Sequence, residues 1–107
     1  MVKTDDHIVV FVTVNSVKKA GVIAKELLSQ KAAACVNTLG IDSIFTWKSK
    51  IEKTKEILLI VKSRHKLFKK IEKIIRQFHS YEVPEIIALP IIAGHKPYLD
   101  WINENTK

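Results

Sequence analysis

The sequence predicts an α+β fold of the ferredoxin-like type, an antiparallel sheet with two helices on one face and a short C-terminal helix. Two observations predict it. Apolar residues alternate between β-branched runs and helical spacing in the order strand, helix, strand, strand, helix, strand, which is the split βαβ plan. The chain has 107 residues, 47% hydrophobic and 27% charged, as expected for a single globular domain over residues 1–107.

The first strand and the first helix are predicted within residues 8–28. Residues 8–14 form a continuous apolar, β-branched run, which indicates a strand buried on both faces. Asn15 or Ser16 can then cap a helix, because a short polar side chain accepts a hydrogen bond from the first helical turn. The apolar residues of this helix recur at helical spacing: Val17, Ala20, Ile23, Ala24, Leu27 and Leu28.

A hairpin is predicted to follow the first helix. Residues 33–38 form a strand, Gly40 breaks or bends it, and residues 43–48 resume it. Residues 48–50 form the turn, whose type the sequence leaves open because it contains no glycine and no Asn-Gly pair. Residues 56–62 form the return strand.

The second half of the chain is predicted to form a helix, an edge strand and a terminal helix. Residues 65–77 place apolar side chains on one stripe and basic side chains on the opposite side. Pro84 disfavours helix at the preceding residue, so the chain must extend before a strand over residues 86–92. Pro90 has no N–H donor, which places this strand at a sheet edge. Residues 97–104 form the terminal helix, with a proline in its first turn.

The predicted sheet is apolar on both faces. Residues 9–12 and 57–61 show no polar alternation, although a strand with one solvated face should alternate. Both main helices are expected on the same face. The other face therefore needs a partner surface, most simply further copies of the chain, and a dimer would satisfy this pattern as well as a trimer.

Charge and composition exclude several classes of partner. The formal net charge is +7, and residues 48–76 hold eleven Lys or Arg against three Glu. This stretch can attract polyanions, but aromatic residues do not interleave the lysines for base stacking, so we expect a solvated surface and no nucleic-acid partner. The apolar runs are too short to span a bilayer and no secretory leader is evident, so we expect no membrane partner.

Cys35 is the only cysteine of the chain. An internal disulfide is therefore impossible, which fits a cytoplasmic protein. Because Cys35 sits among alanines and a valine, we expect a small, buried apolar side chain with a structural role. The other histidines, His7, His65 and His95, do not have the spacing of a zinc site.

One loop gathers polar side chains that are candidates for a functional site. His79, Tyr81, Glu82 and Glu85 lie around Pro84, and the chain then enters a strand. Functional residues often lie on such loops because a rigid scaffold positions them. The sequence contains no phosphate-binding glycine loop and no nucleophile elbow, so we expect no catalytic residue and no enzymatic activity.

Residues 8–102 resemble the CutA family of divalent-cation tolerance proteins. The segment around the candidate loop is the most specific part of the resemblance. The matching segments are Ala33-Ala34-Cys35-Val36-Asn37, Ser43-Ile44-Phe45-Thr46-Trp47, Ile57-Leu58-Leu59-Ile60-Val61-Lys62, His79-Ser80-Tyr81-Glu82-Val83-Pro84-Glu85-Ile86-Ile87-Ala88-Leu89-Pro90 and Tyr98-Leu99-Asp100-Trp101-Ile102.

This resemblance implies a ferredoxin-like subunit, a homotrimer whose sheets meet across subunits, and an architecture similar to PII signalling proteins. It also implies copper binding and a role in the tolerance of copper and other heavy metals. The alternative function is a PII-like signalling trimer that binds a small anionic ligand and an unidentified protein partner. The basic stretch that begins at Lys48 favours that alternative.

His79 is the metal ligand that the resemblance implies. Copper sites proposed for some members use a strand cysteine and two adjacent histidines, and Val12 and Phe78 occupy the other two positions here. Glu82, Glu85 or a second subunit can supply further ligands, and Cu(II) leads the divalent metals at such sites. We therefore expect weak binding of Cu2+ or another divalent cation and no obligatory cofactor. Alternatively, the His79 ring hydrogen-bonds to close the loop.

A cleft between subunits is the second candidate site. The resemblance suggests that Trp47, Lys62, Tyr81 and Glu82 line it and bind a small ligand. Alternatively, the two aromatic residues fill the interface and the carboxylates pair with lysines of a neighbouring subunit.

The chain departs from the family pattern at two places. Leu39-Gly40 stands where the family often has Pro-Gly, and Lys48-Ser49 stands where it has Glu-Gly. The second change removes an acidic residue and a conformationally permissive glycine from the hairpin tip.

Overall fold

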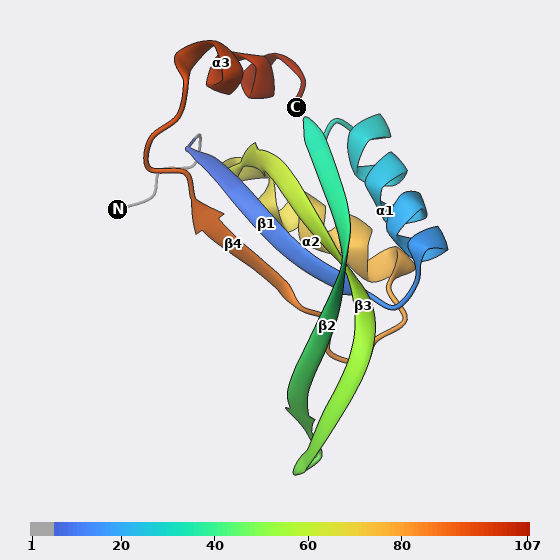
Figure 1. The fold of residues 1–107 in the computed structure, drawn as a ribbon. Coiled ribbons are helices and arrows are strands. Elements are labelled where there is room, and N and C mark those ends of the chain that lie inside the picture. The colour runs from blue at the N-terminus through green and yellow to red at the C-terminus, as the bar shows by residue number, and fades with distance from the viewer. Residues whose placement is uncertain (1–5) are drawn as a thin grey trace.

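Strands and helices follow one another in the predicted order (Figure 1). The computed structural model describes residues 6–107. A short 3-10 helix, η1, precedes the second α-helix. The elements are β1 (His7–Val14), α1 (Val17–Ser29), β2 (Cys35–Trp47), β3 (Lys50–Arg64), η1 (His65–Leu67), α2 (Phe68–Phe78), β4 (Ile86–Pro90) and α3 (Lys96–Glu104).

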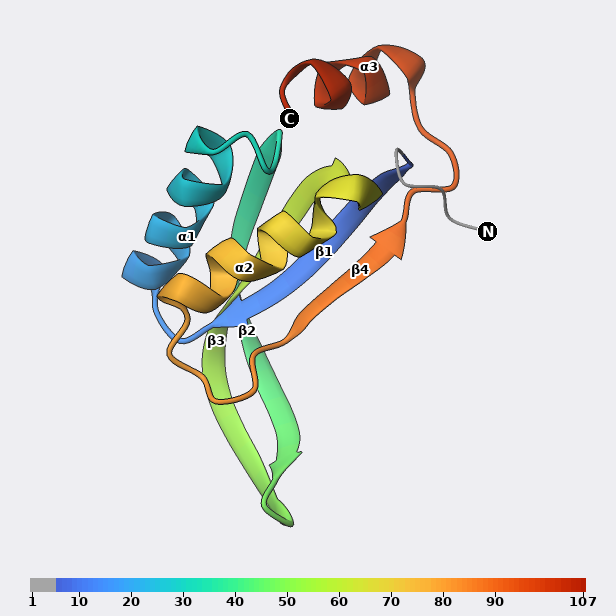
Figure 2. The same ribbon diagram turned by 180° about the vertical axis from the view of Figure 1, so that it is seen from behind.

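The four strands form one antiparallel sheet in the order β2-β3-β1-β4. Helices α1 and α2 lie on one face of this sheet, as both views show (Figure 1 and Figure 2). This arrangement confirms the predicted ferredoxin-like fold. The prediction for Pro90 is also confirmed, because β4 pairs only with β1 and lies at the sheet edge.

The core lies between the helices and the covered face of the sheet. Ser16 begins α1 by accepting a hydrogen bond from the Lys19 N–H at 3.1 Å, so it is the cap that the sequence left open between two residues. The fully buried side chains come from the covered face of the two central strands and from the inner stripe of both helices. They include Val10, Val12, Val14, Leu59, Val61, Ile23, Leu27, Ile71 and Ile75.

The opposite sheet face is apolar and has no helix over it. The register pairs Val9 with Lys62 and Phe11 with Ile60, and these side chains point away from the core because neighbouring strand residues alternate between faces. On the same face Leu39 of β2 is 46% exposed and Ile87 of β4 is 50% exposed, whereas Val9, Phe11 and Ile60 are half-buried. The predicted bare apolar face is therefore present, and we call it the open face.

The hairpin differs from the prediction. Gly40 does not break the strand: it pairs with Ile57 inside a continuous β2 and has no positive φ. Strand β3 begins at Lys50 rather than residue 56, because residues 50–55 pair fully with β2 although Lys and Glu are disfavoured in strands. Beyond Gly40 the two strands therefore project past the helices as an arm (Figure 1).

The tip of this arm is a two-residue turn. Lys48 and Ser49 have φ values of 51° and 65°, and the flanking residues Trp47 and Lys50 pair with each other. Positive φ at both central positions defines a type I′ turn, which matches the twist of the strands but favours glycine and asparagine. The turn type that the sequence left open is thus settled, with two unfavourable residues in it.

Helix α3 lies at the end of the sheet opposite the arm (Figure 1 and Figure 2). Ile102 anchors it with a fully buried side chain. The Arg64 Nε donates a hydrogen bond to the Thr106 Oγ1 at 2.8 Å, and a second Arg64 nitrogen donates to the Thr106 carbonyl at 2.8 Å. In the described residues no helix is long and apolar enough to cross a membrane.

We expect Ser49→Gly to raise the free energy of unfolding by about 1 kcal/mol, because glycine adopts the left-handed conformation without a steric cost. Chemical denaturation at a fixed protein concentration measures this. The matched control is Ser43→Gly, which places glycine within the extended strand β2 and should lower stability instead. Equal effects of both variants would contradict the turn assignment.

Candidate functional site

The candidate loop connects α2 to β4. Helix α2 ends at Phe78, and His79 is already extended, with φ −90° and ψ 138°. Strand β4 begins at Ile86, directly after the loop that contains Pro84. The polar residues therefore lie at the entrance of an edge strand, as the sequence predicts.

The His79 ring closes this loop with both of its nitrogens. The Tyr81 backbone N–H donates a hydrogen bond to Nδ1 at 3.1 Å, so Nδ1 must be unprotonated. The proton then lies on Nε2, which donates to the Thr13 carbonyl oxygen at 2.6 Å. This is the loop-closing alternative of the sequence analysis. A metal ion can reach this ring only by displacing one of the two hydrogen bonds.

Tyr81 and Glu56 form a second contact beside His79. The Tyr81 hydroxyl donates a hydrogen bond to the Glu56 Oε2 at 2.7 Å, and Glu56 is only 7% exposed. The rings of His79 and Tyr81 lie 4.6 Å apart between centroids. Burial raises the pKa of Tyr81 to about 12, and the hydrogen bond and negative charge of Glu56 add to this effect.

Glu56 was missed by the sequence analysis as a site residue. It lies directly before the apolar run of β3, where the register pairs it with Ile41. Strand alternation places it on the same face as Leu58 and Ile60. A carboxylate next to the apolar run of a strand, on a mostly apolar sheet face, is the signal that could have found it, because a buried carboxylate requires a hydrogen-bond donor.

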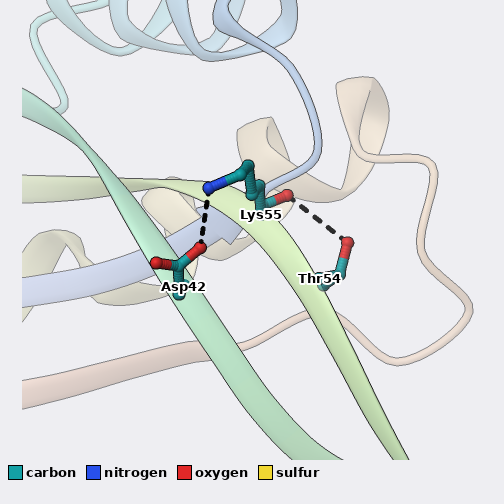
Figure 3. Close-up of polar contacts among 3 residues, drawn as sticks. All are labelled: Asp42, Thr54 and Lys55. Carbon is teal, nitrogen blue, oxygen red and sulfur yellow. Dashed lines mark hydrogen bonds and ion pairs between the residues drawn. The ribbon is translucent and has the colours of Figure 1, made fainter.

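Glu56 also lines a groove of about 410 Å³ between the start of α1 and the base of the arm. On its wall the Lys55 Nζ lies 3.1 Å from the Asp42 Oδ1 (Figure 3). The Thr54 hydroxyl donates a 3.5 Å hydrogen bond to the Lys55 carbonyl oxygen. Lys55 and Asp42 are mostly exposed, so their ion pair contributes little to stability. The groove is thus an open surface with a mixed polar and apolar lining, next to the Tyr81–Glu56 contact.

The predicted metal-binding residues do not form a metal site within one subunit. Glu82 and Glu85 are exposed, whereas the His79 ring is occupied by its hydrogen bonds. Residues 6–107 contain no group of three or more His, Cys, Asp and Glu side chains that could hold a metal ion. A copper site at His79, Glu82 and Glu85 stays a prediction and requires ligands from a second subunit.

The predicted cleft residues are also far apart within one subunit. Trp47 lies at the arm tip, where it pairs with Lys50, whereas Lys62 lies on the open face opposite Val9. Lys50 and Lys62 are twelve residues apart on β3, which separates them by roughly 40 Å along an extended strand. A cleft that contains Trp47, Lys62, Tyr81 and Glu82 therefore needs more than one subunit.

Cys35 differs from its predicted environment. We expected a buried side chain, but Cys35 is only half-buried. The reason is its position at the start of β2 opposite Lys62, which puts the thiol on the open face. Burial and the neighbouring Cys35 thiol raise the pKa of Tyr98 on α3. Cys35 is therefore part of the sheet surface next to α3 rather than of the core.

Comparison with known proteins identifies close relatives. The family model described as CutA1 divalent ion tolerance protein matches residues 8–105. A divalent-cation tolerance protein CutA from Thermus thermophilus is 44% identical over 92% of this chain and 96% of its own length. A chloroplastic CutA protein of Arabidopsis thaliana is 40% identical, and the match covers 98% of this chain but only 58% of that longer protein.

Solved structures agree with these relatives. The structure of a periplasmic divalent cation tolerance protein CutA from Archaeoglobus fulgidus matches with a TM-score of 0.92 and 42% identity. The match covers 94% of this chain and 99% of that chain. Because one relative is described as chloroplastic and another as periplasmic, the cytoplasmic location stays a prediction for this chain.

We expect Glu56→Gln to lower the pKa of Tyr81 from about 12 towards its ordinary value of 10, because the variant removes the negative charge that disfavours tyrosinate. Tyrosinate absorbance during an alkaline titration measures this. The variant Tyr81→Phe removes the Tyr81 transition from the titration curve and so identifies it, since Tyr98 is the only other tyrosine.

The same contact predicts how stability depends on pH. Between pH 10 and about 12 the folded protein keeps the Tyr81 proton while the unfolded chain loses it, so the free energy of unfolding falls as the pH rises through this range.

The control for the tyrosine titration is Glu52→Gln, which removes an exposed carboxylate of the arm and should leave the pKa of Tyr81 unchanged. A Tyr81 pKa that does not respond to Glu56→Gln would contradict the contact.

Proposed function

Because the chain belongs to the CutA1 divalent ion tolerance family, we propose that it acts as a non-enzymatic homotrimer in the tolerance of divalent cations. The observation that carries this proposal is the open face. Ile87, Phe11 and Ile60 form an apolar row across β4, β1 and β3. The row ends at Asn37 on β2, two residues from the exposed Leu39 on the same face. An apolar surface of this kind is characteristic of a subunit interface.

The arm supports a ring rather than a pair of subunits. It projects beyond the helices and exposes apolar side chains on both of its faces: Ile44 is 68% exposed, Ile51 81% and Trp47 38%. An arm that lies on the next subunit forms a heterologous contact, and such contacts close into a ring when the rotation between subunits allows it, with three subunits as the smallest such ring. Three subunits then cover three open faces at once.

Cation binding in this proposal occurs at the clefts between subunits and is weak. Glu82 and Glu85 are exposed carboxylates at the entrance of β4, the strand at the sheet edge. Oxygen ligands from two subunits can meet at such an edge, and Cu(II) has the highest affinity for N/O sites of this kind. His79 joins such a site only if a metal ion displaces either the Tyr81 N–H or the Thr13 carbonyl oxygen from its ring.

A PII-like signalling trimer is the second candidate function. It shares the proposed assembly and differs in its ligand, which would be a small anion, and in having a protein partner. The exposed lysines of the arm favour it: Lys48, Lys50, Lys53 and Lys55. Saturable binding of anionic metabolites, without saturable binding of copper, would select this candidate over the first.

We expect Ile60→Lys to dissociate the trimer, because the new charge would have to be buried in the interface without a partner. Sedimentation velocity measures the mass. The control Val22→Lys makes a similar change on the outer side of α1, where the residue is 40% exposed, and should leave the trimer intact. Intact trimers for both variants would remove the open face from the interface.

We expect the double variant Glu82→Gln with Glu85→Gln to weaken Cu(II) binding about tenfold or more, since it removes two oxygen ligands. Isothermal titration calorimetry of the trimer measures this. His95→Ala is the control, because this exposed histidine lies before α3, outside the loop. The metal part of the proposal fails if the native protein gives no saturable heat, or if the control weakens binding as much as the double variant.

A further inference from the structure

The positive charge of the chain is concentrated on its helices. Together α1, η1 and α2 carry eight Lys or Arg and two Glu, a net charge of +6 out of +7 for the whole chain. The sheet, the arm and α3 are close to neutral in sum. The basic stretch recognised in the sequence is therefore divided, and its α2 part joins the lysines of α1.

The exposed cations of these helices point away from the sheet. Ile71, Ile74 and Ile75 of α2 are buried against the core, so the opposite side of that helix faces solvent. The same holds for α1, whose Ile23 and Leu27 are buried. We call the exposed basic residues of the two helices the basic face: Lys18, Lys25, Lys66, Lys69, Lys73 and Arg76.

Acidic residues neutralise little of this charge. The Glu72 carboxylate lies 3.7 Å from the Lys69 Nζ, an exposed pair that contributes little. The other acidic residue of these helices, Glu26, accepts a hydrogen bond from the Ser29 hydroxyl at 3.4 Å. On η1 and α2, five basic residues are thus accompanied by a single acidic residue.

Helix stability does not explain this arrangement. Lys66, Lys69 and Lys73 are three or four residues apart, where like charges destabilise a helix. The first turn of α2 carries Lys69 and Lys70 and no acidic residue, and no side chain caps the helix. Cations at this end oppose the helix dipole. The Lys70 Nζ is compensated, because it donates hydrogen bonds to the Gln30 and Lys107 carbonyl oxygens at 2.6 and 3.1 Å. The remaining cations break local rules of helix stability, which is expected where a surface serves a function.

We propose that the basic face is a docking surface for a membrane that contains anionic phospholipids, which departs from the expectation, based on the short apolar runs, of no membrane partner. Clusters of four to eight Lys and Arg on an amphipathic helix favour such surfaces. On α1 the exposed apolar residues Val22 and Leu28 lie among the lysines and suit the headgroup region. A nucleic acid fits less well, since α1, η1 and α2 have no exposed aromatic side chain for stacking.

This docking is electrostatic and peripheral. The apolar stripe of α2 is buried in the core, so this helix cannot insert into the bilayer. Helices α1 and α2 lie on the sheet face opposite the open face (Figure 2). An assembly through the open face therefore leaves the basic face free. The inference is therefore independent of metal binding and of the identity of the small ligand.

Vesicle co-sedimentation tests the proposal with the full chain. We expect binding to vesicles of phosphatidylserine and phosphatidylcholine, and none to phosphatidylcholine alone. Raising the salt from about 0.1 M to about 1 M shortens the Debye length from about 10 Å to about 3 Å and should abolish binding. The variant Lys66→Gln, Lys69→Gln, Lys73→Gln should weaken binding on the order of 100-fold, which corresponds to three lysines at about 1 kcal/mol each.

Two matched variants distinguish binding through the basic face from binding that depends only on the net charge of the protein. Lys48→Gln, Lys50→Gln, Lys53→Gln removes the same charge from the arm and should leave binding within about threefold of the native protein. The three basic-face lysines changed to arginine should preserve binding and show that the face folds normally. Equal losses in both glutamine variants, no binding to the anionic vesicles, or binding to duplex DNA but not to those vesicles would each overturn the proposal.

Discussion

The structure depends on a sheet with apolar side chains on both faces and helices on only one. Val10 and Val61 lie under α1 and α2, whereas their neighbours Phe11 and Ile60 lie on the open face. Strand alternation makes this unavoidable, because a continuous apolar strand must present apolar groups in both directions. The hydrophobic effect then favours a second layer over the open face, and in the proposed assembly that layer comes from other chains. The proposed assembly and the inter-subunit clefts follow from this constraint.

The sequence predicted the order of elements and the open face because both depend on hydrophobic periodicity. The sequence-based prediction was wrong in the hairpin arm, where strand pairing outside the core determines the structure. Residues 50–55 look unlike a strand because they are charged, yet they pair with β2 in the arm. Gly40 looks like a break, yet an extended glycine pairs as readily as another residue. These interactions depend on the partner strand, which single-residue preferences do not encode.

The candidate loop was located from sequence, but its contacts were not. Pro84 and the following strand marked its place, and His79 and Tyr81 were both singled out. Their partners, the Thr13 carbonyl and Glu56, come from β1 and β3 and meet the loop only in the fold. Cys35 was assigned to the core because its neighbours are apolar, whereas its strand position places it on the open face. Predicting which residues contact a loop thus requires the register of the sheet, and the sequence alone does not specify that register.

The two sides of the subunit carry different chemistry. The open face is apolar and lies opposite the helices, while the helices carry most of the net charge. The most direct test of the account is the mass of the unmodified protein in solution, measured by light scattering during progressive dilution. The account predicts a particle of three times the 12.2 kDa of one chain that persists at the lowest concentrations. A folded particle of 12.2 kDa that stays single on concentration would contradict it.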